Sequence, residues 1–262
     1  YKRQIIVVLY HSFLIKKGVY MSNPILNDKF LESEVVLESQ PMTVNGAINK
    51  TLILFALLLL PAAYTWSLVF QGFMDKAMML CIGGAIAGFV VALILAFARK
   101  FANVLAPVYA ICEGFFVGGI SAFFEASYAG IVIQAIAATF GAMLSMLLLY
   151  KAKVIVCTDK FRAVIFTATL SIAIIYLIQI VASLFGRGIP QIFTSSPIGI
   201  GFSLIVVGIA ALNLIVDFDF IEQGAQRMLP KEYEWYGAFG LMVTLVWLYI
   251  EILRLLAKLR DR

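Results

Sequence analysis

The sequence predicts an all-α, polytopic membrane protein with seven transmembrane helices. Of its 262 residues, 63% are hydrophobic and only 13% are charged, and the mean hydropathy is +0.99. An average soluble domain is about 45 to 50% apolar. A helix that crosses a bilayer needs about 20 mainly apolar residues. Seven segments meet this requirement: 50–70, 77–98, 104–124, 129–150, 162–185, 197–218 and 237–259.

Residues 1–48 precede the first span and are predicted to form a disordered N-terminal tail, followed by a transmembrane domain at 49–262. The apolar run within residues 1–20 is too short to span and lacks a small-residue cleavage site. Met21 opens a polar stretch that reads like an ordinary N-terminus, so residues 1–20 are interpreted as an artefact of start-site choice. The tail carries a modest acidic cluster that we expect to be solvated.

The first three spans contain helix-perturbing and small residues. Pro61 interrupts the first span. Glycines three or four residues apart let helix backbones approach closely, so we expect close packing of the second and third spans rather than glycine-hinged gating. The glycines are Gly83, Gly84, Gly88, Gly114, Gly118 and Gly119.

Two connections near the C-terminal end have distinct signals. Ser196 followed by Pro197 predicts the start of the sixth span, because serine caps helices and proline suits their first position. The longest internal connection, DFIEQGAQRMLPKEYEWYG, mixes both charge signs with aromatic residues, which is typical of the membrane interface.

The basic residues predict that the N-terminus is cytoplasmic, since cytoplasmic loops carry an excess of lysine and arginine. On that side lie Lys2, Arg3, Lys16, Lys17, Lys29, Lys50, Arg99, Lys100, Lys151, Lys153, Lys160, Arg162, Arg227 and Lys231. The other side has Lys76 and Arg187 in its loops. Seven crossings also place Arg254, Lys258, Arg260 and Arg262 there, which runs against the rule.

Several classes of function are excluded. The net charge of +5 reports orientation here rather than nucleic-acid binding. The only histidine is His11, so a Ser-His or Cys-His catalytic site has no base inside the membrane. There is no HExxH zinc motif and no P-loop. The three cysteines, Cys81, Cys112 and Cys157, are too widely spaced for a readable disulfide or zinc pattern and are expected to be inert. We expect no enzyme and no cofactor.

Three acidic residues within or beside the spans are the candidate functional residues: Glu113, Asp217 and Glu251. An ionised acid at the centre of a membrane helix costs about 2.5 to 3.5 kcal/mol on insertion scales, so such residues usually face a bundle interior or a watery path. Three acids could line a cation path, because oxygen is the ligand that Ca²⁺ prefers. Alternatively, each acid only bonds a neighbour. Arg254 could pair with Glu251 three residues earlier, and Asp217 could be an interfacial helix-end acid. An aspartyl protease dyad of Asp217 and Glu251 is disfavoured, because the GxGD motif is missing.

Around these acids the chain resembles the Bax inhibitor-1 family, in its bacterial YccA-type branch, over residues 45–260. The motifs that carry the resemblance are ICEGFFVGG at 111–119, IVDFDFIEQ at 215–223 and WLYIEILRLL at 247–256. The second and third together are fairly specific. In this chain the seventh-helix acid is glutamate where the family commonly has aspartate, and the sixth-helix motif reads Asp-Phe-Asp, which makes Asp219 a competing candidate.

The resemblance implies a seven-helix bundle with the seventh helix at its centre, in the inner membrane of a bacterium. It implies a pH-sensitive Ca²⁺ leak in which Asp217 and Glu251 share a proton, sense pH and hold Ca²⁺ transiently. Glu113, Asp219 and Arg254 are then candidates for lining or latching the pore. The partners implied are the lipid bilayer, Ca²⁺ and protons. An alternative is a non-transporting regulator that binds other membrane proteins, such as a quality-control protease.

Overall fold

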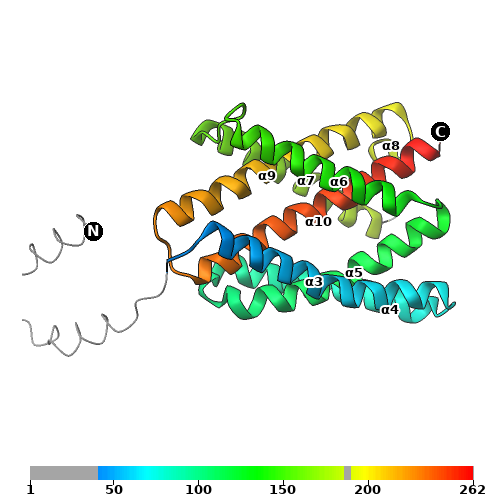
Figure 1. The fold of residues 1–262 in the computed structure, drawn as a ribbon. Helices are drawn as coiled ribbons and strands as arrows, with labels where there is room; N and C mark the ends of the chain where they lie inside the picture. Colours follow the sequence, from blue (N-terminus) through cyan, green and yellow to red (C-terminus); the bar gives the residue numbers. More distant parts are fainter. Residues whose placement is uncertain (1–40, 186–189, 262) are drawn as a thin grey trace, which may run out of the picture. The chain divides into compact units, whose positions relative to one another are not determined.

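The computed structural model describes residues 41–185 and 190–261, and its regular elements within these ranges are helices (Figure 1). Seven of them are long and apolar enough to cross a membrane, so the predicted fold class is confirmed. These are α3 (Val44–Phe70), α4 (Met74–Phe97), α5 (Ala102–Ser127), α6 (Ile131–Lys151), α7 (Asp159–Leu184), α9 (Pro197–Gln226) and α10 (Glu232–Arg260). The turn η1 (Arg99–Phe101) and the short α8 (Pro190–Phe193) lie between them.

The last helix, α10, lies at the centre of the bundle. It packs directly against α3 and α5 on one side and α6 and α9 on the other (Figure 1). It is also the most deeply buried of the seven spans. The central position of the seventh helix is therefore confirmed. Helices α4 and α7 lie at the outside of the bundle: α4 packs on α3 and α5, and the backbone of α7 comes close to that of α9 only, among the described elements.

Glycines bring α3, α4 and α5 into close contact. A Cβ atom added to Gly118 of α5 would overlap the backbone of Ala62 in α3. One added to Gly84 of α4 would lie 2.5 Å from the carbonyl oxygen of Cys112 in α5. The predicted close packing is confirmed at these positions. Gly83 is different, because it has open space beside it.

The first helix begins earlier than hydropathy predicts. Thr43 caps α3, and its hydroxyl oxygen accepts a hydrogen bond from the Gly46 amide at 2.9 Å. Residues 44–48, which were predicted to belong to the tail, are therefore helical. The rest of the predicted tail, residues 1–40, lies outside the described residues. Pro61 lies inside α3, which continues through it.

The polar connection between the last two spans is mostly helical, in contrast to the prediction. The sixth span was expected to end at 218, but α9 continues to Gln226 and α10 begins at Glu232. Hydropathy indicates where side chains meet lipid, whereas helical hydrogen bonding continues into the interface. Asp217 consequently lies nine residues before the end of α9 and is not a helix-end acid. At the other end, the predicted start is confirmed, since Ser196 caps α9 and Pro197 is its first residue.

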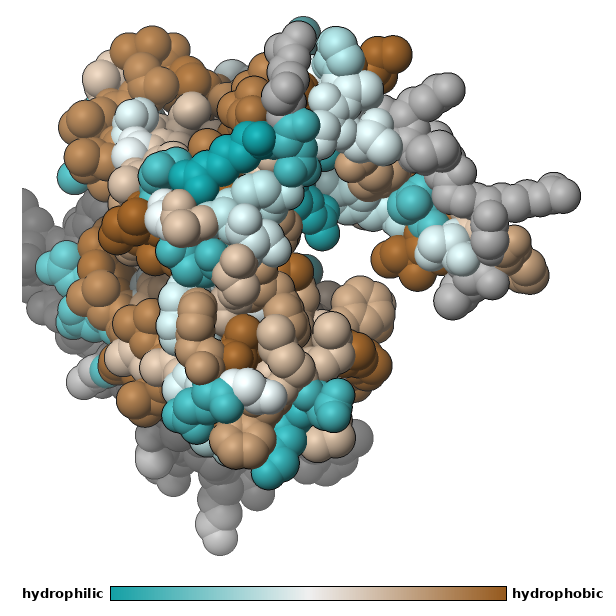
Figure 2. All heavy atoms as spheres, turned by 90° about the vertical axis from the view of Figure 1, so that its right-hand side faces the viewer, coloured by the Kyte–Doolittle hydropathy of each residue, from teal (hydrophilic) through white to brown (hydrophobic). Residues whose placement is uncertain are grey.

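The two ends of the bundle differ in charge. One end, here called the basic face, contains the α9–α10 turn, the start of α3 and the start of α7, and it carries nine cationic side chains among the described residues. These are Lys50, Arg99, Lys100, Lys151, Lys153, Lys160, Arg162, Arg227 and Lys231. The opposite end, where α10 terminates, is shown in Figure 2, with hydrophobic side chains along the flanks and hydrophilic ones gathered on the end itself. This distribution is that of a multi-pass membrane protein.

Candidate functional site

The side chain of Asp217, on α9, faces the central helix α10, and its carboxylate is only partly hydrogen-bonded within the described residues. A side-chain hydrogen bond joins it to Thr244 of α10. Its Oδ1 faces Gly240, one turn before Thr244, where an added Cβ atom would lie 3.7 Å away. Its Oδ2 is buried and has no hydrogen-bond partner among the described residues. Buried polar atoms are nearly always bonded, so this oxygen marks a place where a proton, a water molecule or a cation is needed.

Glu251 lies in the other half of α10 and is fully paired. Only 1% of the residue is exposed. The hydroxyl of Tyr176 in α7 donates to its carboxylate at 2.9 Å, and Arg254 forms an ion pair with it at 3.2 Å. The guanidinium of Arg254 also lies over the Tyr176 ring, 5.4 Å from its centroid. The sequence-based alternative of an intrahelical Glu251–Arg254 pair is therefore present in the structure.

The structure does not bring Asp217 and Glu251 together. Asp217 meets α10 at Thr244, and Glu251 follows seven residues later. At about 1.5 Å per residue, this spacing separates the two sites by roughly 10 Å along the helix axis. Seven residues are nearly two turns, so both sites lie on similar sides of α10. Each acid has its own partners in this conformation, and direct proton sharing between them is not seen.

Glu113 occupies a third, separate position between α5 and α4. It is buried, with 8% exposed, and is hydrogen-bonded to Tyr109 one turn earlier. A Cβ atom added to Gly88 of α4 would lie 3.0 Å from its Oε2. Glu113 thus faces the outer helix α4, and the structure does not assemble the three acids into one ring.

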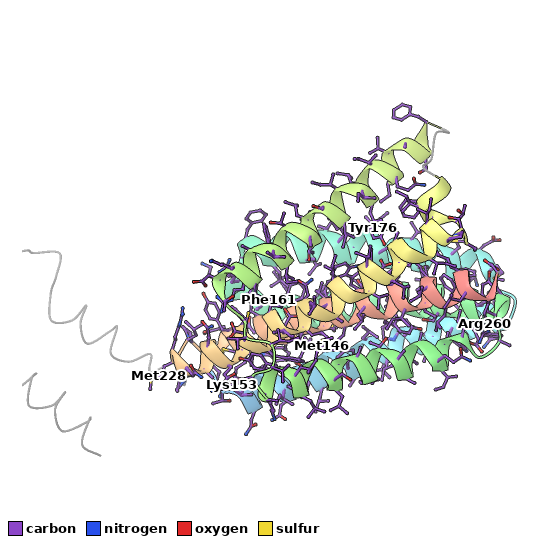
Figure 3. The ribbon with its side chains drawn as sticks, turned by 90° about the horizontal axis from the view of Figure 1, so that it is seen from above. Met146, Lys153, Phe161, Tyr176, Met228 and Arg260 are labelled. Atoms are coloured by element: carbon purple, nitrogen blue, oxygen red, sulfur yellow. The ribbon has the colours of Figure 1, made fainter. Side chains whose placement is uncertain are left out.

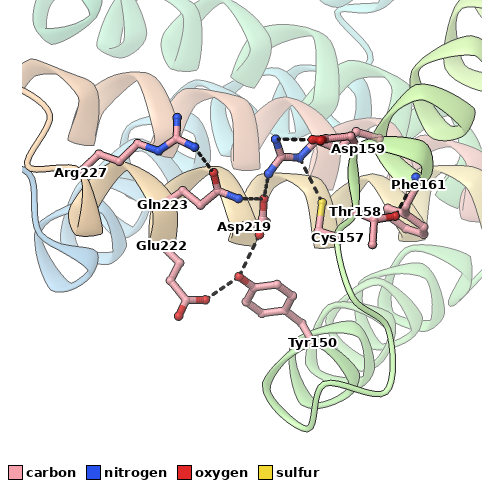
Figure 4. Close-up of polar contacts among 10 residues, drawn as sticks. Tyr150, Cys157, Thr158, Asp159, Phe161, Asp219, Glu222, Gln223 and Arg227 are labelled. Carbon is pink, nitrogen blue, oxygen red and sulfur yellow. Dashed lines mark hydrogen bonds and ion pairs between the residues drawn. The ribbon is translucent and has the colours of Figure 1, made fainter.

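Asp219 belongs to a polar cluster at the basic face (Figure 4). It forms an ion pair with Arg162 of α7. It also accepts hydrogen bonds from Gln223 at 2.8 Å and from the Tyr150 hydroxyl at 3.4 Å. With its carboxylate paired in this way, Asp219 joins α6, α7 and α9 at one end of the bundle.

Helix α7 is fastened to the rest of the bundle by polar residues at heptad spacing. Arg162, Thr169 and Tyr176 are each seven residues apart and so share one face of the helix. Thr169 accepts a hydrogen bond from Asn213 of α9 at 2.8 Å, while the other two bind Asp219 and Glu251. The apolar contacts of this face come from Ile165 and Ile172, both buried. Figure 3 shows α7 leaning away from α9 toward its end, with Tyr176 on its inner side.

Two charged residues with several polar partners, the buried Glu234 and the half-buried Lys258, were missed from the sequence. Glu234, only 2% exposed, forms an ion pair with Lys50 of α3 and accepts hydrogen bonds from the Thr43 amide at 2.9 Å and hydroxyl at 3.0 Å. Lys258 donates to the carbonyl oxygens of Ile192 and Gly199, both at 3.1 Å, and to Ser203. Both residues lie near helix ends, where charged side chains are expected to meet water, so no sequence signal distinguishes them.

Two groups outside the spans have perturbed pKa values. Burial raises the pKa of the Cys157 thiol, although the nearby Arg162 guanidinium, 3.4 Å from its sulfur, works in the opposite direction. Donation of its hydroxyl proton to Asp261 at 2.5 Å raises the pKa of Tyr128.

Within the described residues no three acidic, histidine or cysteine side chains are grouped to hold a metal ion. Asp217 and Glu251, the expected Ca²⁺ ligands, would each supply one carboxylate at its own site. A resident Ca²⁺ ion takes six to eight oxygen ligands, which neither carboxylate supplies by itself.

The comparisons with known proteins agree with the fold. The family model described as Bax inhibitor 1 like matches residues 23–261, which is nearly the whole chain and all seven spans. No curated protein matches the chain.

Proposed function

We propose that this chain, which belongs to the Bax inhibitor 1 like family, is a proton-regulated leak channel for Ca²⁺ with Asp217 and Glu251 as its pH-sensing groups. The observation that carries the proposal is the buried Oδ2 of Asp217 beside the central helix, which has no hydrogen-bond partner in the described part of the chain. A carboxylate oxygen in such a position is satisfied by a proton or by a cation, and the two compete for it. This competition links cation passage to pH.

Gly240 and Thr244 make the Asp217 site suitable for an ion in transit. Gly240 presents no side chain toward the carboxylate, and Thr244 adds a hydroxyl group to the oxygen atoms available. Hard cations prefer oxygen ligands. The site has few of them, so a Ca²⁺ ion would be held weakly enough to leave, as conduction requires.

Glu251 would act as a second sensor through its partners. Its negative charge holds Arg254 and orients the Tyr176 hydroxyl of α7. Protonation of the carboxylate would remove the ion pair and weaken the attachment of α7 to the central helix. In this proposal the two acids are coupled through α10 and α7, and sharing of one proton would require a second conformation in which their helices have shifted.

The proposal is tested by Ca²⁺ flux into liposomes that contain the purified protein and an entrapped Ca²⁺ indicator, between pH 6 and pH 8. Asp217→Asn and Glu251→Gln remove the titrating charge at nearly constant volume. We expect each substitution to reduce the pH dependence of flux and the double variant to abolish it. Asp75→Asn, which alters an exposed acid at the start of α4, is the matched control and should behave like the wild type. Unchanged flux and unchanged pH response in the double variant would overturn the sensor assignment.

A second candidate function is that of a membrane regulator that binds other membrane proteins, such as a quality-control protease. One observation favours it: the backbone of α7 comes close to that of one other described helix, α9, and its outer side leaves large apolar residues exposed, among them Phe166, Leu177 and Ile180. Co-purification distinguishes the two functions. Partner binding should survive neutralisation of Asp217 and Glu251 but fail when the exposed face of α7 is changed.

A further inference from the structure

Two adjoining cavities flank the end of α9 on the basic face. The larger, of about 410 Å³, is lined by polar side chains that include Tyr150 and Glu222. The smaller, of about 240 Å³, is lined by Arg162, Arg227 and the apolar Val216, Phe220 and Leu229. Only the smaller cavity therefore combines two guanidinium groups with an apolar wall.

The cationic groups of the smaller cavity are not fully used by the protein. Arg227 donates to the neutral amide oxygen of Gln223 at 3.0 Å, and no carboxylate among the described residues lies within ion-pair distance of it. Among the described residues, the only acid that lines this cavity is Asp219, which is already paired with Arg162 and bonded to Gln223. The lining thus carries two positive charges and one negative charge, which leaves a net charge of +1.

The position of the cavity fits a ligand that is anionic at one end and apolar at the other. Arg162 lies in the first turn of α7, and Arg227 directly follows α9, so both lie where the spans reach the interface. The surrounding face carries nine cationic side chains. Its acids in the described residues are five, Asp159, Asp219, Glu222, Glu232 and Glu234, so an anion is attracted from a distance. Basic pockets between spans on such a face are suited to lipid head groups.

We propose that this cavity binds the phosphate group of an anionic phospholipid. The Arg227 and Arg162 guanidinium groups would donate to the phosphate oxygens, for which their planar, forked geometry is well matched. Val216, Phe220 and Leu229 would contact the glycerol and the first carbons of the acyl chains. The polar groups of the larger cavity lie beside the head group. This site does not depend on ion conduction.

The test is binding of short-chain lipids to the full-length protein in detergent, followed by native mass spectrometry. Dioctanoyl phosphatidylglycerol is compared with dioctanoyl phosphatidylcholine, which has the same chains but no net charge, and with inorganic phosphate. We expect phosphatidylglycerol to bind at least fivefold more tightly than phosphatidylcholine and inorganic phosphate to displace it poorly. Arg227→Gln should weaken phosphatidylglycerol binding at least fivefold. Arg227 is exposed, so this variant is expected to fold normally.

Lys100→Gln is the matched control, because it removes one positive charge from the same face at an exposed residue outside both cavities. It should change phosphatidylglycerol binding less than twofold. An equal loss in the two variants would show that only the general charge of the face matters and would overturn the proposal. Equally tight binding of inorganic phosphate would assign the site to free phosphate and would overturn the lipid assignment.

Discussion

At the scale of single residues, the buried acids of this protein differ in how their charge is compensated. Glu234 forms an ion pair with a lysine and accepts hydrogen bonds from the amide and the hydroxyl of Thr43. Glu251 forms an ion pair with an arginine and accepts a hydrogen bond from a tyrosine. Asp217 is hydrogen-bonded to a threonine, and its other carboxylate oxygen has no partner within residues 41–185 and 190–261. Full pairing holds a carboxylate in one position, and incomplete pairing indicates a place where a proton, a water molecule or a cation binds. Asp217 is for this reason the residue on which the proposed function depends most.

The Glu234–Lys50 ion pair is predicted to stabilise the fold. Glu234→Gln leaves the Lys50 ammonium group without its counter-charge at a site where the glutamate is 2% exposed. Removal of one partner of a buried pair costs about 3 to 5 kcal/mol, and the lower value applies because Lys50 retains some access to water. Thermal unfolding of the purified protein should therefore begin several degrees lower.

Glu232→Gln provides the control for this prediction. Glu232, two residues before Glu234, is the first residue of α10 and is exposed, so the loss of its charge should change the unfolding temperature by less than about one degree. If the two variants unfold at the same temperature as the wild type, the ion pair contributes little to stability.

At the scale of elements, α7 is the helix most easily displaced. Among the described helices its backbone comes close to α9 only, and its polar contacts with α9 and α10 are made by Arg162, Thr169 and Tyr176. Each of the other spans packs against two or more neighbouring helices. Helices α3 and α5 also approach so closely at glycines of α5 that an added Cβ atom would overlap the α3 backbone. A change of charge at Glu251 is consequently expected to move α7 before it moves any other span.

Tyr176→Phe is predicted to loosen the second half of α7. The ring remains under the Arg254 guanidinium, but the hydroxyl that donates to Glu251 of α10 is lost. We expect faster amide hydrogen exchange in residues 172–183, measured by mass spectrometry in nanodiscs, and little change in residues 159–168.

Leu177→Ala is the control on the same helix, because Leu177 is 60% exposed on its outer side. Exchange in this variant should match the wild type. Equal exchange in Tyr176→Phe and Leu177→Ala would mean that apolar packing on α9 holds α7 without help from Glu251.

At the scale of the whole molecule, the basic face is predicted to be cytoplasmic. Cys157 lies on this face between α6 and α7, outside the spans. A membrane-impermeant maleimide should therefore label it in inverted vesicles and not in intact cells, after Cys81 and Cys112 have been replaced by alanine. The raised pKa of the Cys157 thiol keeps it protonated near pH 7, and only the thiolate reacts, so labelling should be slow at pH 7 and accelerate toward pH 9.

Ala129→Cys, placed in a Cys157→Ala background, reports the opposite face, since Ala129 is exposed in the turn between α5 and α6. It should be labelled in intact cells. The two positions are separated by α6 alone, so labelling of both from the same side would contradict the crossing of the membrane by α6, and the reverse pattern would invert the orientation.

Much of the fold and the identity of the candidate residues could be predicted from the sequence, and the partners of those residues could not. Hydropathy located the seven spans, but it placed Asp217 at the end of the sixth. The next eight residues of α9 are helical as well, but they are too polar to be recognised as part of a span. The Glu251–Arg254 pair was predictable from their spacing on one helix. The contacts of Glu251 with Tyr176 and of Asp219 with Arg162 join helices far apart in the chain, and no local pattern encodes them.

The sequence by itself determined that the protein crosses the membrane seven times, which end is basic and which acids are costly to bury. These properties follow from local composition, because transfer of a helix into lipid depends mainly on its own side chains. Only the tertiary structure decided which acids are neutralised by partners and which one is left incomplete. Compensation of a buried charge depends on side chains that lie within a few ångströms in space, whatever their separation in the chain.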